Sequence, residues 1–149
     1  MIVNKIVIGS DHGGFEYKEI IKNHLLALEY EVLDVGCFDK SSIDYPDIAL
    51  KLCEIVNRDK IKGILVCGTG IGIGIAANKC PGIRAALCHD EYSARMARLH
   101  NDSNVLTLGQ RVVGEGLMLS IVDTWLDSKF EGGRHENRVN KIIKMEGEK

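Results

Sequence analysis

A cysteine followed by glycines at alternate positions is the feature of the sequence with the clearest chemical potential. Cys67 ends a short apolar segment, and glycines follow it at positions 68, 70, 72 and 74. Such a loop exposes several backbone N–H donors at the start of a helix, which suits a phosphate or a developing oxyanion. A tight strand-to-helix turn is the simpler interpretation, but it needs fewer than four glycines, so we favour a ligand site.

The thiol of Cys67 has two interpretations. A lone buried cysteine at the end of a strand is more often a small core residue than a reactive group. Cys67, however, lies at the edge of the glycine loop, where the N-terminus of the next helix favours the thiolate form. A thiolate beside backbone N–H donors could remove a proton next to a carbonyl while the donors stabilise the oxyanion that forms.

A nucleotide-binding interpretation of the same loop fails on its register. Residues 72–77, Gly-Ile-Gly-Ile-Ala-Ala, fit the dinucleotide pattern G-x-G-x-x-A. In that fold the first glycine comes directly off the strand, whereas Gly72 lies well past Cys67. The P-loop pattern G-x-x-x-x-G-K-[ST] does not occur in the sequence either.

Two histidine-containing segments are weaker candidates. Asp11 and His12 follow the first expected strand and precede two glycines, which would let a ligand approach the backbone. A helix N-cap explains Asp11 equally well. The segment His100-Asn101-Asp102 ends an expected helix, where the helix dipole favours a cationic histidine, so a structural role of His100 also stays open.

Arginines form a third candidate cluster. Arg111 follows the fifth expected strand, and Arg134 and Arg138 lie four residues apart at the start of the last helix. That spacing places two guanidinium groups on one helix face, which suits a phosphate dianion, although solvated surface arginines are the commoner outcome. The residues that we expect on the surface without a role are His24, Arg95, Arg98 and His135.

The elements that must position these residues follow an alternating pattern. Short β-branched runs alternate with longer segments of helical period, which predicts an α/β class with a parallel sheet covered by helices. Strands are expected near Lys5–Gly9, Glu31–Val35, Gly63–Cys67, Arg84–Cys88 and Val105–Leu108. Helices are expected near Phe15–Leu28, Pro46–Asn57, Gly72–Lys79, Glu91–His100, Gly114–Ser128 and Arg134–Met145. In such a sheet ligands bind beyond the carboxyl ends of the strands, where the loops described above begin.

Composition narrows the class of protein further. The 149 residues predict a single domain, residues 1–149, with 45% hydrophobic and 27% charged residues as in ordinary globular proteins. A formal charge of -2 provides no basic field for nucleic acid, and no apolar stretch approaches a membrane span, so neither partner is expected. Five cysteines without a Cys-x-x-Cys pair indicate reduced thiols and a cytosolic protein, with neither a disulfide framework nor a zinc knuckle.

Seven segments together carry a resemblance to a known family. In chain order they are Asp11-His12-Gly-Gly, Asp44-Tyr45-Pro46, Cys67-Gly-Thr-Gly-Ile-Gly, Ala76-Ala77-Asn78-Lys79, Gly82-Ile83-Arg84-Ala85, His100-Asn101-Asp102 and Glu131-Gly132-Gly133-Arg134-His135. Their order and spacing resemble the type B ribose-5-phosphate isomerases, a family that also contains galactose-6-phosphate and allose-6-phosphate isomerases. The likeness covers nearly the whole chain.

The resemblance implies a fold, a reaction and a set of catalytic residues. The fold would be a Rossmann-like, doubly wound, five-stranded parallel sheet with a C-terminal helix, working as a homodimer with a tetramer left open. The reaction would interconvert ribose 5-phosphate and ribulose 5-phosphate, in the non-oxidative pentose phosphate pathway, without metal or cofactor. By this likeness Cys67 moves a proton between two carbons through an enediolate, and His100 opens the furanose ring with Asp11.

Substrate contacts are implied in the same way. Asn101 and the loop amides would hold the enediolate oxygens, Thr69 and Tyr45 would contact sugar hydroxyls, and Thr69 is also counted with the catalytic group. The loop residues concerned are Gly68, Thr69, Gly70, Ile71 and Gly72. The phosphate would be bound by Arg111, Arg134, Arg138 and His12. Another branch of the family uses a glutamate where this chain has Ile73, so the chain resembles the cysteine branch.

Two alternatives and one geometric expectation remain. A hexose-6-phosphate isomerase would use the same chemistry, and a non-catalytic sugar-phosphate-binding module would need neither Cys67 nor His100. The helix Glu91–His100 runs back from the fourth strand, so His100 should lie at the opposite rim of the sheet from Cys67. We therefore expect each active site to be shared between two chains.

Overall fold

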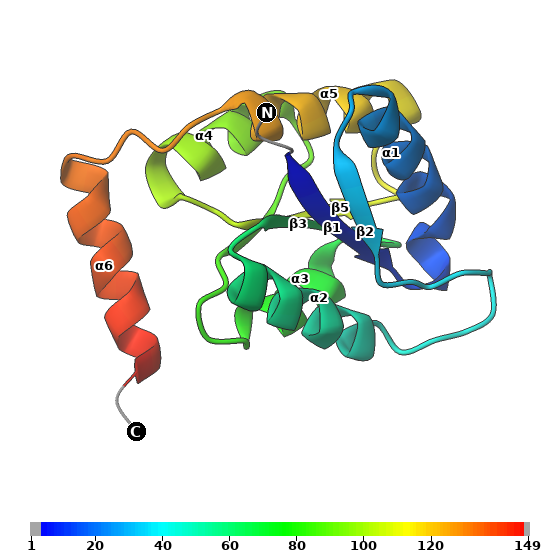
Figure 1. Cartoon of the computed structure of the whole chain (residues 1–149), viewed down its shortest axis with the longest axis horizontal. Helices are drawn as coiled ribbons and strands as arrows, with labels where there is room; N and C mark the ends of the chain where they lie inside the picture. Colours follow the sequence, from blue (N-terminus) through cyan, green and yellow to red (C-terminus); the bar gives the residue numbers. More distant parts are fainter. Residues whose placement is uncertain (1–3, 148–149) are drawn as a thin grey trace.

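Five parallel strands form one sheet at the centre of the molecule (Figure 1). The computed structural model describes residues 4–147. The strands are β1 (Lys5–Ser10), β2 (Glu31–Asp34), β3 (Lys62–Cys67), β4 (Ala85–Leu87) and β5 (Val105–Gly109), in the spatial order β2-β1-β3-β5-β4. The helices are α1 (Phe15–Ala27), α2 (Tyr45–Asp59), α3 (Ile71–Asn78), α4 (Glu91–Asn101), α5 (Glu115–Asp127) and α6 (Arg134–Gly147), with a 3-10 turn at His12–Gly14. The α/β class and the five-stranded parallel sheet are as predicted.

Helices cover both faces of the sheet, which explains the apolar runs of its central strands. Along β3, Ile64 and Val66 pack with α1, α4 and α5 on one face, whereas Leu65 and Cys67 pack with α2 and α3 on the other. Trp125 of α5 is fully buried in the first of these two cores. Within residues 4–147, no helix combines the length and the apolar character needed to cross a membrane.

The order of the strands decides where a crevice opens. The chain leaves β1 toward the α1 face and leaves β3 toward the α3 face, although β1 and β3 are neighbours. Loops that diverge from adjacent strands leave a crevice at the carboxyl ends, the usual ligand position in open α/β sheets. The chain leaves β5, on the other side of β3, toward α5 on the α1 face. The end of β3 therefore lies between two diverging connections.

Glycines allow three backbones to approach one another at this point. The 3-10 turn after β1 packs so tightly on β3 that a Cβ at Gly14 would overlap the carbonyl group of Val66. A Cβ at Gly109, at the end of β5, would lie 2.6 Å from the carbonyl oxygen of Thr69. The loops after β1, β3 and β5 are thus held together by close packing of main chain.

The C-terminal end of α4 differs from the prediction. Arg95 is exposed as expected, but Arg98 is buried: its Nη1 donates to the Ser103 carbonyl at 2.6 Å and to Asp102 Oδ1 at 3.0 Å. Its guanidinium also lies 5.9 Å from the centre of the Trp125 ring. The long side chain folds back so that its guanidinium bonds to the loop after α4, so an exposed position was the wrong prediction.

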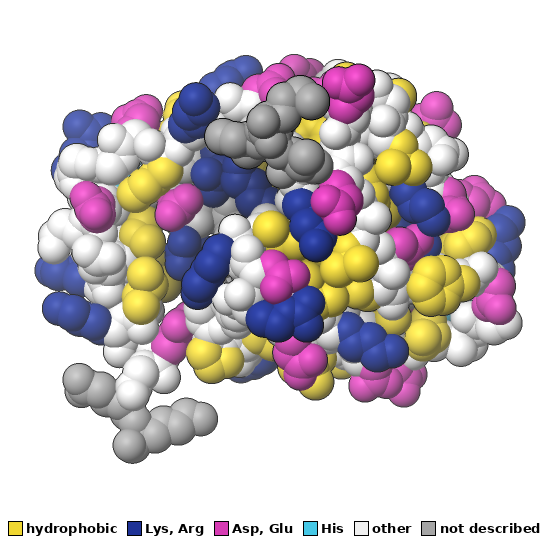
Figure 2. All heavy atoms as spheres, in the orientation of Figure 1, with side chains coloured by type: hydrophobic (Ala, Val, Ile, Leu, Met, Phe, Trp, Pro, Cys, Tyr) yellow, Lys and Arg dark blue, Asp and Glu magenta, His cyan; other side chains and the backbone are white. Residues whose placement is uncertain are grey.

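Helix α6 stands apart from the sheet (Figure 1). It packs against the end of α4, where His135 stacks on His100. His135 and Val139 are buried, whereas Ile142, Ile143 and Met145 are exposed. Figure 2 shows hydrophobic side chains along the side of α6 that faces the rest of the molecule. An isolated helix of this length is only marginally stable, so α6 needs to pack its apolar side against another protein surface.

We expect Gly14→Ala to lower the free energy of unfolding by about 1–3 kcal/mol, because the added methyl would force the first loop away from β3. Gly116→Ala is the matched control, since a Cβ there would meet no described atom within 4 Å and Gly116 lies in α5. It should be neutral or stabilising by up to about 1 kcal/mol. Urea denaturation of both variants is the measurement, and equal stabilities would contradict the role of Gly14.

Candidate active site

Cys67 ends β3 with its thiol inside the glycine loop. The Gly70 N–H donates to Cys67 Sγ at 3.0 Å, and the side chain is 5% exposed. Gly70 has a φ of +78°, a conformation that favours glycine and turns the loop back over the sulfur. The N–H groups of Gly72 and Ile73 belong to the first turn of α3, where a helix has no internal acceptors. The loop therefore presents donors and a positive helix end beside a thiol.

Two other buried thiols, those of Cys53 and Cys88, are poor candidates for a base. Burial, assisted by the charge of Asp90, raises the pKa of the Cys88 thiol to about 12. Burial and the neighbouring Cys80 raise the pKa of Cys53 well above its usual range. Cys67 differs from both in lying at the end of a central strand with a backbone N–H donor on its sulfur.

Asp11 and His12 both have structural partners in the loop after β1. Asp11 Oδ1 accepts from the Gly13 and Gly14 N–H groups at 2.9 and 3.2 Å, so the N-cap interpretation is confirmed. The Asp11 N–H donates to the Val66 carbonyl at 3.2 Å, which places this carboxylate next to the end of β3. His12 Nδ1 accepts from the Ile43 N–H at 3.2 Å and so anchors the segment that leads to α2.

Tyr45 and Arg111 cover the glycine loop from two sides. Tyr45 is the first residue of α2, and its Oη would lie 2.8 Å from a Cβ at Gly72. The Arg111 Nη1 would lie 3.2 Å from a Cβ at Gly68, and its backbone N–H donates to the Gly68 carbonyl at 2.9 Å. Thr69 is exposed, and its Oγ1 accepts from the Ile71 N–H at 3.2 Å. The structure thus gathers Asp11, Tyr45 and Arg111 around the Cys67 loop.

A second group of predicted residues lies elsewhere, where α4 ends and α6 begins. The rings of His100 and His135 stack with centroids 4.1 Å apart and an angle of 10° between their planes. The Nε2 of His100 lies 4.0 Å from Glu131 Oε1, and the Nε2 of His135 lies 3.7 Å from Glu131 Oε2. Asn101 is the last residue of α4, and its carbonyl accepts from Arg84 Nε at 3.0 Å.

His135 is buried, contrary to the prediction that it lies on the surface. Glu131 donates its N–H to the Leu99 carbonyl at 3.0 Å, and Gly132 and Gly133 then turn the chain so that α6 begins against the end of α4. Burial, followed by the charges of His100 and Arg134, lowers the pKa of His135. Arg138 acts in the same direction, so both predicted phosphate-binding arginines lie near this histidine.

Sequence reasoning missed Glu131 as a member of this group. It also found no set of metal ligands, whereas His100, Glu131 and His135 have donor atoms that all lie within 4.8 Å of one another. The only local signal is the spacing of four residues between Glu131 and His135. His100 comes from a distant part of the chain and could not be placed beside them from spacing alone.

The two groups lie at opposite edges of the sheet. The residues after His100 lead to Asn104, whose carbonyl accepts from the Gly63 N–H at the start of β3, whereas Cys67 ends that strand. A strand of six residues spans about 16 Å at roughly 3.3 Å per residue. Within one chain, therefore, His100 and Cys67 do not meet at one small ligand.

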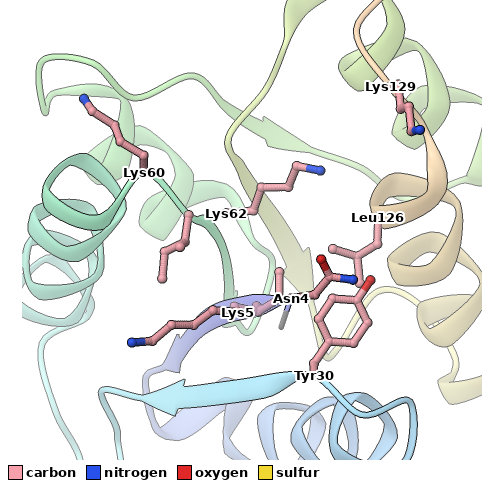
Figure 3. A pocket seen from close by; sticks show the side chains of 9 residues that line it. Asn4, Lys5, Tyr30, Lys60, Lys62, Leu126 and Lys129 are labelled. Atoms are coloured by element: carbon pink, nitrogen blue, oxygen red, sulfur yellow. The ribbon is translucent and has the colours of Figure 1, made fainter. Parts of the chain in front are cut away.

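A hollow of about 560 Å³ at the starts of the strands does not extend the Cys67 site (Figure 3). Its labelled lining residues are Asn4, Lys5, Tyr30, Lys60, Lys62, Leu126 and Lys129. Figure 3 shows the ammonium groups of Lys5 and Lys60 pointing away from those of Lys62 and Lys129, and Lys5 lies 3.7 Å from Glu31. Because the lysines do not converge, the described residues that line this hollow form no built anion site.

Comparison with known proteins places this geometry in a family. The model of the Ribose/Galactose Isomerase family matches residues 6–142. The ribose-5-phosphate isomerase B of Escherichia coli (strain K12) is 48% identical over 145 residues, which cover 97% of each chain.

Solved structures give the same result. Ribose-5-phosphate isomerase B of Clostridium thermocellum is 56% identical with a TM-score of 0.94, covering 95% of this chain and 97% of that chain. The enzyme of Mycoplasma genitalium, solved with bound ribulose-5-phosphate, is 41% identical with a TM-score of 0.95, covering 100% of both chains. The chain therefore belongs to the ribose/galactose isomerase family, among its type B ribose-5-phosphate isomerases.

Proposed function

We propose that the chain interconverts ribose 5-phosphate and ribulose 5-phosphate through an enediolate, with Cys67 as the base. The observation that carries the proposal is the Cys67 Sγ at the end of the central strand, with the Gly70 N–H on it and the start of α3 beside it. The relatives named as ribose-5-phosphate isomerases, and the ribulose-5-phosphate complex of one of them, support the choice of substrate.

The proposed chemistry needs only a base and hydrogen-bond donors for the oxyanion. In the open-chain aldose, the Cys67 thiolate takes the proton from C2, the C–H electron pair forms the C1–C2 double bond, and O1 becomes an oxyanion. The amides of the glycine loop stabilise that charge, since they are fixed before the reaction starts. Cys67 then returns its proton to C1 while the proton of the C2 hydroxyl passes to O1, which leaves the ketone at C2.

Binding of the sugar phosphate calls for both groups of residues. On the Cys67 side, Tyr45 and Thr69 would contact sugar hydroxyls, and Arg111 would contact the phosphate. His100, Asn101, Arg134 and Arg138 lie on the other side, where His100 would open the furanose ring with Asp11. Because one chain keeps these groups at opposite edges of the sheet, the proposed active site contains residues of two chains.

A two-fold homodimer meets this requirement. A symmetric interface repeats each contact between the chains, so two equivalent composite sites form at once. The exposed apolar side chains of α6 supply a surface that a second chain would cover. Beside them, a hollow of about 410 Å³ lined by Ile142, Met145 and Ile83 separates α6 from the body of the molecule.

A hexose-6-phosphate isomerase remains the second candidate, because the family that matches the chain includes galactose isomerases. The chemistry at Cys67 would be unchanged, and only the depth of the pocket would differ. A sugar-phosphate-binding module without activity would need neither Cys67 nor His100, so the retention of both argues against that function.

We expect Cys67→Ser to keep the fold and to lower turnover by at least ~100-fold, the usual scale of a positioned base. The measurement is ketose formation without added metal from ribose 5-phosphate, allose 6-phosphate and galactose 6-phosphate, with ribose 5-phosphate the best substrate of the unaltered enzyme. Cys80→Ser is the control, since Cys80 is half-buried and outside the glycine loop. A serine variant at position 67 with a near-normal rate would make Cys67 a core residue only.

We expect Arg134→Ala to raise the KM for ribose 5-phosphate far more than Arg95→Ala does. Arg134 lies beside His135 and is assigned to the phosphate, whereas Arg95 is exposed on α4 and has no assigned contact. Steady-state kinetics of the two variants decide the assignment, because a lost ground-state contact raises KM more than it lowers kcat. Similar KM values in both variants would remove Arg134 from the phosphate site.

The shared site predicts complementation between two inactive chains. Cys67→Ala and His100→Ala chains, unfolded and refolded together in equal amounts, should recover roughly a quarter of normal activity. Half of the randomly paired dimers are mixed, and each mixed dimer carries one site with both lesions and one site with neither. Each variant refolded alone is the control. Mixed dimers that are verified by mass and stay inactive would show that each site belongs to one chain.

A further inference from the structure

Three side chains near the start of α6 have the composition of a metal site. One ring nitrogen of His100, one of His135 and one carboxylate oxygen of Glu131 lie within 4.8 Å of one another. Two imidazoles and one carboxylate are the protein ligands of a common class of zinc site, which leaves a fourth position open. The two ring planes are almost parallel, so His100, whose side chain is 38% exposed, must rotate before both ring nitrogens can face one ion.

The buried Nε2 of His135 is a second, independent observation. His135 is 6% exposed, and this nitrogen has no hydrogen-bond partner among the described residues. Buried polar atoms are nearly always partnered, so an exception calls for a ligand or another explanation.

Besides this rotation, the Glu131 carboxylate must move closer to both nitrogens to hold an ion. Ligand atoms around tetrahedral zinc are roughly 3.3 Å apart, given metal–ligand bonds of about 2.0–2.1 Å. Glu131 lies 3.7 Å from the nitrogen of His135 and 4.0 Å from that of His100, so each distance must close by less than an ångström. The side chain of Glu131 is 51% exposed and that of His135 is 7% exposed, so the carboxylate has more room to move than the imidazole.

The surrounding charges indicate which ions fit. Arg134 and Arg138 face His135 from α6, and their positive charges disfavour a cation there. An anion bound to the metal as its fourth ligand would offset these charges. Two imidazole nitrogens select zinc, cobalt, nickel or copper, whereas magnesium and calcium prefer oxygen ligands. An ion here would occupy the nitrogen that His100 needs for proton transfer in the proposed ring opening.

We propose that His100, Glu131 and His135 form a binding site for one divalent transition-metal ion such as Zn²⁺, and that its occupancy inhibits the isomerase. The inhibition rests on the proposed function, whereas the binding does not. The metal plays no part in the reaction, so a chelator should restore activity rather than abolish it.

Cobalt binding tests the site directly. Co²⁺ is titrated into the full chain and followed by its visible d–d absorption, which should appear without the near-ultraviolet band of thiolate ligation. Glu131→Gln and His135→Ala should each weaken cobalt binding by at least ~10-fold, since even losing an outer contact of a metal ligand costs that much. His24→Gln is the control, because His24 pairs with Asp123 outside the cluster. Circular dichroism checks that each variant is folded.

Two results would overturn the binding site. One is unchanged cobalt affinity in Glu131→Gln, an exposed position whose substitution should not disturb folding. The other is a thiolate band that disappears in Cys67→Ser, which would place the ion on the cysteine instead.

Inhibition is tested separately from binding. Zn²⁺ should inhibit isomerisation, whereas Mg²⁺ should not. In Glu131→Gln, with inhibition measured against the metal-free rate of the same variant, the inhibitory Zn²⁺ concentration should rise. The increase should match the factor by which the substitution weakens cobalt binding. Binding at the cluster without inhibition would refute the inhibitory half of the proposal. A protein that binds cobalt as expected but never forms ketose would refute the proposed function and leave the metal site standing.

Discussion

The close approach of three main chains at the end of β3 is the constraint on which the candidate site depends. Val66 accepts the N–H of Asp11 and also lies against Gly14, while Gly109 lies against Thr69. Side chains at these two glycines would push the loops after β1 and β5 away from Cys67. The thiol can therefore have a carboxylate on one side and Arg111 on the other only because the residues between them lack side chains.

The same architecture separates the candidate base from the candidate ring-opening histidine. A helix that joins two parallel strands must run antiparallel to them, so α4 starts at the carboxyl edge and ends at the opposite edge. His100 lies on the last turn of α4 and cannot reach Cys67 within its own chain. A reaction that uses both groups thus requires either a second chain or a different histidine. The exposed apolar side chains of α6, close to His100, support the proposal of a second chain.

Local patterns predicted the helices and strands, whereas contacts between residues far apart in the chain could not be predicted from the sequence. The apolar run before Cys67 and the glycines after it indicated a central strand and a ligand loop, and both are present. Arg98 and His135 were expected on the surface because charged and polar side chains usually lie there. Arg98 is buried beside Trp125, which follows 27 residues later, and His135 is buried against His100, which precedes it by 35 residues. No helical period or turn signal encodes such pairs.

Position 73 shows why a thiol suits this particular loop. Ile73 is fully buried in the same apolar cluster as Cys67, and the resemblance aligns it with the glutamate of another branch of the family. Burial raises the pKa of a carboxyl group toward neutrality, whereas a helix N-terminus favours the thiolate of a cysteine. Either change brings a base into the range that proton transfer from carbon requires. Since isoleucine cannot carry a proton, Cys67 supplies the one thiol or carboxyl group of the segment 67–74, and the proton of the proposed reaction has a single carrier within that loop.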